Sequence, residues 1–240
     1  MHPARESLEV LQQIRANIGE YHFAGQYQQS PVPQGGSIIK LHWLKKMSSF
    51  QWPTAFDQII QSWDTASKVT DMSDFSVCTT WGIKGKVAYL LDVYRGRLDF
   101  PALRQKAIDL YHVYKPHRIL VEDKSSGIQL IQELKNIGFY HVQAVKPQRD
   151  KAMRLFMQAA FIEGGGMLLP ENAPWVEDYI LELTSFPTGK YDDQVDSTTQ
   201  ALGWLQESMN KDWILTYMEN DIEKRMARGS CRRIIWISSR

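Results

Sequence analysis

The amino-acid sequence predicts an α/β fold, in which a mixed β-sheet carries helices on both faces. Two observations lead to this fold class. Three segments rich in β-branched and aromatic residues follow one another between residues 58 and 96, which is typical of an antiparallel meander. The later segments alternate short apolar runs with helical periodicity, as in a sheet to which further strands are joined through helices.

The three early strands are predicted at residues 58–66, 75–83 and 86–96. QIIQSWDTA contains a short apolar run that suits a strand ending at Asp64. FSVCTTWGI and KVAYLLDVYRG have the composition of strands, and Lys84-Gly85 lies between them. This arrangement predicts a β-hairpin.

The later segments predict strands and helices in alternation. Asp99 followed by Pro101 is typical of a helix start, with apolar residues at helical spacing after it. The compact run HRILVED (117–123) predicts a buried strand with acidic residues at its end. The remaining elements are a helix at 125–139, a strand at 141–147, and helices at 150–166, 175–186 and 192–209.

The two ends of the chain differ from this central part. Residues 1–18 have an apolar stripe at helical spacing, whereas QYQQSPVPQGGSIIK has two prolines and two adjacent glycines and predicts a linker. Residues 221–240 contain six basic and two acidic residues. We therefore expect a helical arm and linker at 1–50, one domain at 51–210 and a basic tail at 211–240.

The composition argues against several classes of protein. The formal net charge is +1, so the overall charge does not indicate a polyanion partner. The two distant cysteines predict neither a disulfide framework nor a zinc site. No apolar run approaches about 18 residues, and the N-terminus lacks the apolar core of a secretory signal, so we expect a cytoplasmic protein with no membrane partner.

Acidic residues mark three ends of predicted elements. They are Asp64 after the first strand, Glu122 and Asp123 after HRILV, and Asp192, Asp193 and Asp196 at the start of the last helix. Functional groups gather at strand ends and helix starts in mixed sheets. If the first strand and the HRILVED strand are neighbours, Asp64 and Glu122 point into one crevice, and the last helix can deliver Asp193 to it.

Clustered carboxylates repel one another, so a protein retains them where a cation neutralises them. Oxygen ligands suit Mg²⁺ or Mn²⁺, and two such ions about 4 Å apart hold the attacking and leaving oxygens of a phosphodiester. Acidic residues at a helix start are also stabilised by the helix dipole, by about 0.3–1 kcal/mol each, so DDQVD alone favours a capped, solvated helix start. The three acidic sites together favour a site for two Mg²⁺ or Mn²⁺ ions.

SWDTA, VEDKSSGIQLIQEL and KYDDQVDSTTQAL together resemble the C-terminal nuclease domain of bacteriophage large terminase subunits, over residues 55–207. GEYHFAGQYQQSPVPQGGSIIK looks like the segment that joins the terminase ATPase to its nuclease. The resemblance implies an RNase H-like fold and a metal-dependent endonuclease that cuts concatemeric viral DNA during genome packaging. It also implies a phage or prophage gene, and as partners double-stranded DNA, the portal protein and the small terminase subunit.

The resemblance also implies roles for individual residues. The catalytic acids are Asp64, Glu122 and Asp193, and the metal ligands are Asp64, Glu122, Asp192, Asp193 and Asp196. Because a strand alternates its faces, Asp123 is expected to support the ligands without pointing directly inward. Contacts to the DNA backbone are expected from four basic residues, Lys124, Arg149, Lys151 and Arg154.

The chain departs from the family pattern in one respect. No G-x-x-x-x-G-K-[ST] motif occurs in it, so we expect no ATP hydrolysis from this chain. The sequence leaves three interpretations open. The chain is the nuclease of a large terminase, another RNase H-like nuclease such as a resolvase or a transposase-like enzyme, or an inactive prophage remnant or non-enzymatic packaging component.

Overall fold

The computed structural model describes residues 36–66 and 75–209. The chain divides into two compact units, residues 1–202 and 203–240. Of the second unit only residues 203–209 are described, and they are helical. The helix predicted at 1–18, most of the predicted linker and the basic tail lie outside the described residues. No helix in the described ranges is both long and apolar enough to cross a bilayer.

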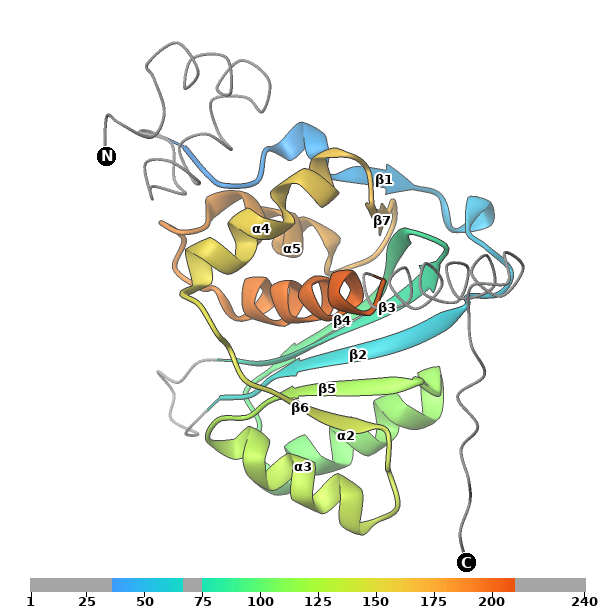
Figure 1. The fold of residues 1–240 in the computed structure, drawn as a ribbon, viewed down its shortest axis with the longest axis vertical. Coiled ribbons are helices and arrows are strands. Elements are labelled where there is room, and N and C mark those ends of the chain that lie inside the picture. Colours follow the sequence, from blue (N-terminus) through green and yellow to red (C-terminus); the bar gives the residue numbers. More distant parts are fainter. Residues whose placement is uncertain (1–35, 67–74, 210–240) are drawn as a thin grey trace, which may run out of the picture. The chain divides into compact units, whose positions relative to one another are not determined.

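The first unit is built on a seven-stranded mixed sheet with the order β1-β7-β4-β3-β2-β5-β6 (Figure 1). The three early strands form the predicted antiparallel meander, and the outer strands on both sides pair in parallel. The strand bounds are β1 (Lys45–Met47), β2 (Gln58–Asp64), β3 (Ser76–Lys84), β4 (Val87–Gly96), β5 (Arg118–Glu122), β6 (Val142–Val145) and β7 (Met167–Pro170).

Helices cover both faces of this sheet, which confirms the predicted fold class. Figure 1 shows α2 and α3 on one face, and α4, α5 and the helix of residues 193–202 on the other. The helix bounds are α2 (Phe100–Tyr114), α3 (Ser126–Asn136), α4 (Lys151–Glu163) and α5 (Val176–Ser185). Two short 3-10 helices, η1 (Leu41–Trp43) and η2 (Ser49–Gln51), flank β1.

Capping aspartates begin two of these helices. Asp99 accepts a hydrogen bond from the Ala102 amide at 2.9 Å, with Pro101 in the first turn of α2. Asp150 accepts one from the Met153 amide, also at 2.9 Å, at the start of α4. Each cap satisfies an amide that the helix leaves unpaired. The predicted helix start at Asp99 is confirmed.

Alternation along β2 decides which side chains enter the core and which face the other helices. Trp63 is fully buried and packs with Val121 of β5 against Leu103 of α2 and Leu130 of α3. Successive side chains of a strand point to opposite faces. Asp64 therefore points away from α2 and α3, as expected for the residue after Trp63.

The structure differs from the sequence prediction in its outer strands and in the hairpin. Neither β1 nor β7 was predicted, and they pair with each other in parallel at the edge of the sheet. Lys45–Met47 therefore forms a strand within the segment that was expected to be a linker. The domain limits of 51 and 210 stay a prediction. The hairpin turn is at Gly85-Lys86, one residue later than predicted, and Gly85 has the positive φ of 57° that such turns require.

Candidate functional site

The first two acidic positions meet at the ends of neighbouring parallel strands. β2 pairs with β5 in the register Trp63 to Val121, so the next positions in line are Asp64 and Glu122. Because Trp63 and Val121 both enter the core on the side of α2 and α3, the two carboxylates emerge on the opposite face. Their convergence therefore follows directly from strand pairing and alternation.

A close backbone approach fixes the end of β5. Gly127, in the first turn of α3, lies so near the strand that a Cβ atom there would be 2.1 Å from the carbonyl oxygen of Glu122. Ser126 beside it donates a hydrogen bond from its hydroxyl to the carbonyl of Ala66, just after β2, at 2.6 Å. The start of α3 thus holds together the two strand ends that carry Asp64 and Glu122.

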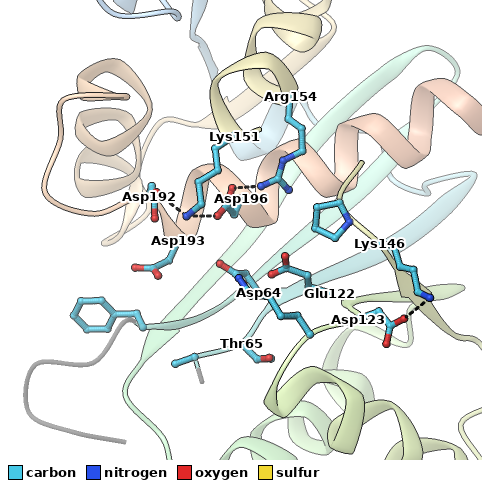
Figure 2. Close-up of a pocket in the computed structure, with 14 residues that line it drawn as sticks. Asp64, Thr65, Glu122, Asp123, Lys146, Lys151, Arg154, Asp192, Asp193 and Asp196 are labelled. Atoms are coloured by element: carbon cyan, nitrogen blue, oxygen red, sulfur yellow. Dashed lines mark hydrogen bonds and ion pairs between the residues drawn. The ribbon is translucent and has the colours of Figure 1, made fainter. Parts of the chain in front are cut away.

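The helix of residues 193–202 brings the third acidic position. Asp196 donates its amide to the carbonyl of Asp192 at 2.9 Å, which closes the first turn. Asp193 and Asp196 are both buried, with 5% and 6% of their surface exposed. In Figure 2 both side chains approach the pair formed by Asp64 and Glu122 from the helix above the sheet.

Buried hydroxyls attach this helix to the sheet. The Ser197 hydroxyl donates to the carbonyl of Ser62 at 2.8 Å and contacts the Thr79 hydroxyl at 2.7 Å. In return, the Ser62 hydroxyl donates to the Ser197 carbonyl at 2.7 Å, and Gln200 donates to the same Ser62 hydroxyl at 2.9 Å. All these groups are shielded from solvent. This reciprocal bonding sets the height and rotation of the helix above β2 and β3.

A second anchor holds the helix start from α5. Glu182 accepts hydrogen bonds at 2.6 Å from both the amide and the side chain of Gln194. The Arg95 guanidinium lies 3.4 Å from the same carboxylate, which is buried. A carboxylate at a helix N-terminus is favoured by the unpaired amides there. Glu182 therefore fixes the residue next to Asp193.

One cavity receives all of these acids, and its volume is about 410 Å³. Carboxylates and cations both line it, together with a few uncharged groups. The carboxylates are Asp64, Glu122, Asp123, Asp192, Asp193 and Asp196, and the cations are Lys124, Lys146, Lys151 and Arg154. The acids predicted from three separate parts of the chain thus face a common space (Figure 2).

The crowding of carboxylates changes their protonation. Burial, followed by a hydrogen bond to Glu122 and the charges of Asp196 and Asp193, raises the pKa of Asp64 well above its usual value. Burial also raises the pKa of Asp196, although the charge of Arg154 opposes this shift. A carboxylate pair that shares a hydrogen bond in a shielded place holds a proton or a cation more readily than two negative charges.

Two cations of α4 contact the acids at one side of the cavity. The Lys151 ammonium lies 2.7 Å from Asp192 and 2.7 Å from Asp196, and Arg154 lies 2.7 Å from the other oxygen of Asp196. Burial alone would lower the pKa of Lys151, but the hydrogen bonds to these aspartates raise it. Both cations were expected to contact the DNA backbone, and here their nitrogens contact carboxylates.

Of the other predicted residues, two line the cavity and one does not. Lys124 and Asp123 line the cavity, and Asp123 pairs with Lys146 at 3.5 Å. Arg149 does not belong to the lining, and its guanidinium contacts the sulfur of Met157. The sequence did not single out Ser62, Ser197 and Glu182, which anchor the helix of the acids, because nothing in their local pattern separates them from ordinary polar residues.

The donor set suits a hard divalent cation. In residues 36–66 and 75–209, no three acidic, histidine or cysteine side chains form a ready coordination shell. However, Asp64, Glu122 and Asp193 line one cavity, and burial together with the neighbouring carboxylates raises the pKa of Asp64, as expected where a proton or a cation would relieve the crowding of negative charge. Carboxylate oxygens are the ligands that Mg²⁺ and Mn²⁺ take in proteins. The residues therefore fit such an ion.

Comparison with known proteins identifies the family. The sequence-family model described as the terminase RNaseH-like domain matches residues 61–203, which include every acid of the cavity. The chain belongs to the terminase RNaseH-like domain family. This confirms the resemblance to large terminase nuclease domains. No curated protein sequence matches the chain.

Solved structures of terminases share the fold. The large terminase of the thermophilic bacteriophage D6E superposes with a TM-score of 0.58 at 13% identity, over 82% of this chain and 52% of that one. This chain therefore spans about half of the D6E terminase. The large terminase nuclease of the thermophilic phage G20c, solved with cobalt, superposes with a TM-score of 0.53 at 16% identity, over 70% of this chain and 97% of that one. The G20c nuclease solved with magnesium gives the same values.

Proposed function

We propose that this chain is a metal-dependent DNA endonuclease that cuts concatemeric viral DNA during genome packaging. The observation that carries the proposal is the convergence of Asp64, Glu122 and Asp193 on one cavity, in a chain of the terminase RNaseH-like domain family. The cobalt and magnesium bound to the G20c nuclease support divalent-cation chemistry on this fold. The family match also favours a terminase over a resolvase or a transposase-like enzyme.

Five carboxylates would hold the metal. The strand ends and the helix start bring Asp64, Glu122 and Asp193 to one cavity, and Asp192 and Asp196 line the same cavity. When bound, two Mg²⁺ or Mn²⁺ ions supply the Lewis acidity that activates water and stabilises the leaving 3′-oxygen. Products with 5′-phosphate and 3′-hydroxyl ends are expected.

The chain's own residues position this chemistry. Lys151 and Arg154 hold the carboxylates of Asp192 and Asp196 in fixed orientations, each through contacts of 2.7 Å. Fixed ligands need little reorganisation when a charge develops between them. Lys124 and Lys146 remain at the cavity wall, where a DNA phosphate approaching the acids would meet a positive charge.

The partners follow from the same role. The substrate is double-stranded DNA, and a packaging nuclease would work with a portal protein and a small terminase subunit in the cytoplasm of a bacterial host. ATP hydrolysis is not part of the activity we propose for this chain. A plasmid-cleavage experiment distinguishes an active nuclease from an inactive prophage remnant, which would not cut DNA.

The test is cleavage of supercoiled plasmid with Mn²⁺ or Mg²⁺, with EDTA as the metal-free reference. The wild-type chain should nick and linearise the plasmid, and Asp64→Asn should lower the rate by at least about a hundredfold, because removing a proposed metal ligand weakens the binding of the ion that the reaction needs. Asp109→Asn is the matched control, because Asp109 is an exposed acid on α2, on the other face of the sheet. Undiminished cleavage by Asp64→Asn would refute the assignment, and a wild-type chain without metal-dependent cleavage would refute the activity.

A further inference from the structure

A group of cationic and aromatic side chains lies beside the acidic cavity and has no part in the proposed metal chemistry. It comprises Phe75, Arg95, Arg97, Lys190 and Tyr191, and we call it the aromatic-cationic cluster. Phe75 precedes β3, the two arginines lie at and just after the end of β4, and Lys190 and Tyr191 precede the helix of the acids. Phe75 also lines the acidic cavity, and Tyr191 is followed by Asp192, so the cluster borders the proposed cutting site.

Aromatic rings gather the cations of this cluster. The guanidinium carbons of Arg95 and Arg97 lie 4.1 and 4.2 Å from the centre of the Phe75 ring. Arg95 also lies 4.6 Å from the Tyr191 ring, and the Lys190 ammonium lies 4.9 Å from it. The two rings contact each other edge to face, at 5.3 Å between centres. Because cations already lie against both rings, we assign the rings to holding the cations and not to stacking a nucleobase.

Three positive charges held this closely repel one another, and an anion would relieve the repulsion. Arg97 lies 4.2 Å from the Phe75 ring and Lys190 lies 4.9 Å from the Tyr191 ring, and these two rings contact each other, so both cations gather at one place. Arg95 does contact a carboxylate, that of Glu182, but this carboxylate also accepts two hydrogen bonds from Gln194. Among the described residues, Nε and Nη2 of Arg95 have no hydrogen-bond partner.

The three cations of the cluster differ in solvent exposure, and this decides which of them can contact a ligand. Arg97 and Lys190 are exposed, whereas the Arg95 side chain is 23% exposed and its two unpartnered nitrogens are covered. Only Arg97 and Lys190 can therefore contact a ligand directly, and Arg95 adds a fixed charge behind them. At the cavity itself, the nitrogens of Lys151 and Arg154 contact the aspartates.

We propose that the aromatic-cationic cluster is a phosphate-binding site for the DNA backbone beside the cut position, with Arg97 and Lys190 as the direct contacts. The proposal rests on the nuclease function proposed above. It places the bound strand so that one phosphate sits at the cluster while a neighbouring phosphodiester lies over Asp64, Glu122 and Asp193. The contacts are to phosphate, so the cluster adds affinity without adding sequence preference.

The experiment measures binding of a labelled 30-base-pair duplex by fluorescence anisotropy, with Ca²⁺ in place of Mg²⁺, between 50 and 300 mM KCl. Each phosphate contact contributes about 0.9 to the slope of log affinity against log salt concentration. The double variant Arg97→Ala/Lys190→Ala should therefore lower the slope by about 1.8 and the affinity at 0.1 M salt by about 60-fold. Lys190→Glu alone, a change at an exposed loop position, should also weaken binding and serves if the double variant does not fold.

Lys86→Ala is the matched control. Lys86 is an exposed lysine in the turn at the opposite end of β4, roughly 36 Å along the strand from Arg97, so its replacement removes one positive charge far from the cluster, whereas the double variant removes two within it. A double variant with the affinity and salt slope of Lys86→Ala, from a wild-type chain that binds and cuts DNA, would overturn the cluster's role alone. A wild-type chain that neither binds duplex nor cuts plasmid would overturn the proposed nuclease function, and this inference with it.

Discussion

Replacing Ser197 by alanine tests how the acidic helix is held above the sheet. The Ser197 hydroxyl donates to the Ser62 carbonyl at 2.8 Å, accepts from the Thr79 amide at 3.2 Å and contacts the Thr79 hydroxyl at 2.7 Å. A buried hydrogen bond contributes about 1 kcal/mol net, and more when its loss leaves a partner unsatisfied. Losing all three should therefore lower the free energy of unfolding by about 3 kcal/mol. For a unit of this size, that corresponds to a decrease of about 6–12 °C in Tm.

The assay is thermal unfolding followed by circular dichroism, with plasmid cleavage measured in parallel at a temperature where every variant is folded. Cleavage by Ser197→Ala should also fall, because Asp193 and Asp196 lie on the same helix as Ser197. Thr188→Ala is the control, since the Thr188 hydroxyl makes one exposed contact of 3.0 Å to the Ser185 carbonyl. That variant should change stability by less than about 0.5 kcal/mol. If Ser197→Ala were no less stable than Thr188→Ala, the anchoring role of the hydroxyl network would be refuted.

Two further substitutions test how the acids are positioned. Arg154→Met should lower the free energy of unfolding by about 1–3 kcal/mol in chemical denaturation, because it leaves the buried Asp196 carboxylate with Lys151 as its remaining cation partner; unchanged stability would contradict this pairing. Gly127→Ala should reduce metal-dependent cleavage at least tenfold, because its Cβ would meet the Glu122 carbonyl at 2.1 Å and displace the end of β5. Full activity in Gly127→Ala would show that the position of Glu122 does not depend on this contact.

The sequence predicted the central part of the fold because its signals are local. The apolar run of β2 ends in Asp64 and the run of β5 ends in Glu122, and strand alternation then places Trp63 and Asp64 on opposite faces. The Asp99 and Asp150 caps mark helix starts in the same local way. These signals predicted that three separate acidic segments would converge, and in the structure their acids line one cavity.

The strands β1 and β7 could not be predicted because the residues that make them strands are distant in sequence. β1 has only three residues, two of them lysines, and β7 has four, which is too short for a period to be recognised. Their pairing, Lys45 to Leu168, joins segments more than a hundred residues apart. Each becomes a strand through its partner and not through its own pattern.

The ion-pair partners of Lys151 and Arg154 could not be predicted from the sequence either. A basic helix start is typical of a phosphate contact or of a solvated surface, and the spacing of KPQRDKAMR does not distinguish these. Only the packing of α4 beside residues 192–196 shows that both cations contact aspartates. Ser62 and Ser197 were missed for a similar reason, since a buried hydroxyl is identified by its neighbours and not by its place in a motif.

Together, Asp64, Glu122 and Asp193 should hold one divalent cation. Anomalous X-ray diffraction from crystals soaked in Mn²⁺ tests it most directly, because the metal position is then observed independently of any activity. An anomalous peak should appear in the cavity, within about 2.0–2.6 Å of carboxylate oxygens from all three residues. Saturating Mn²⁺ with no peak in this cavity, or a peak bound only by residues elsewhere, would contradict it.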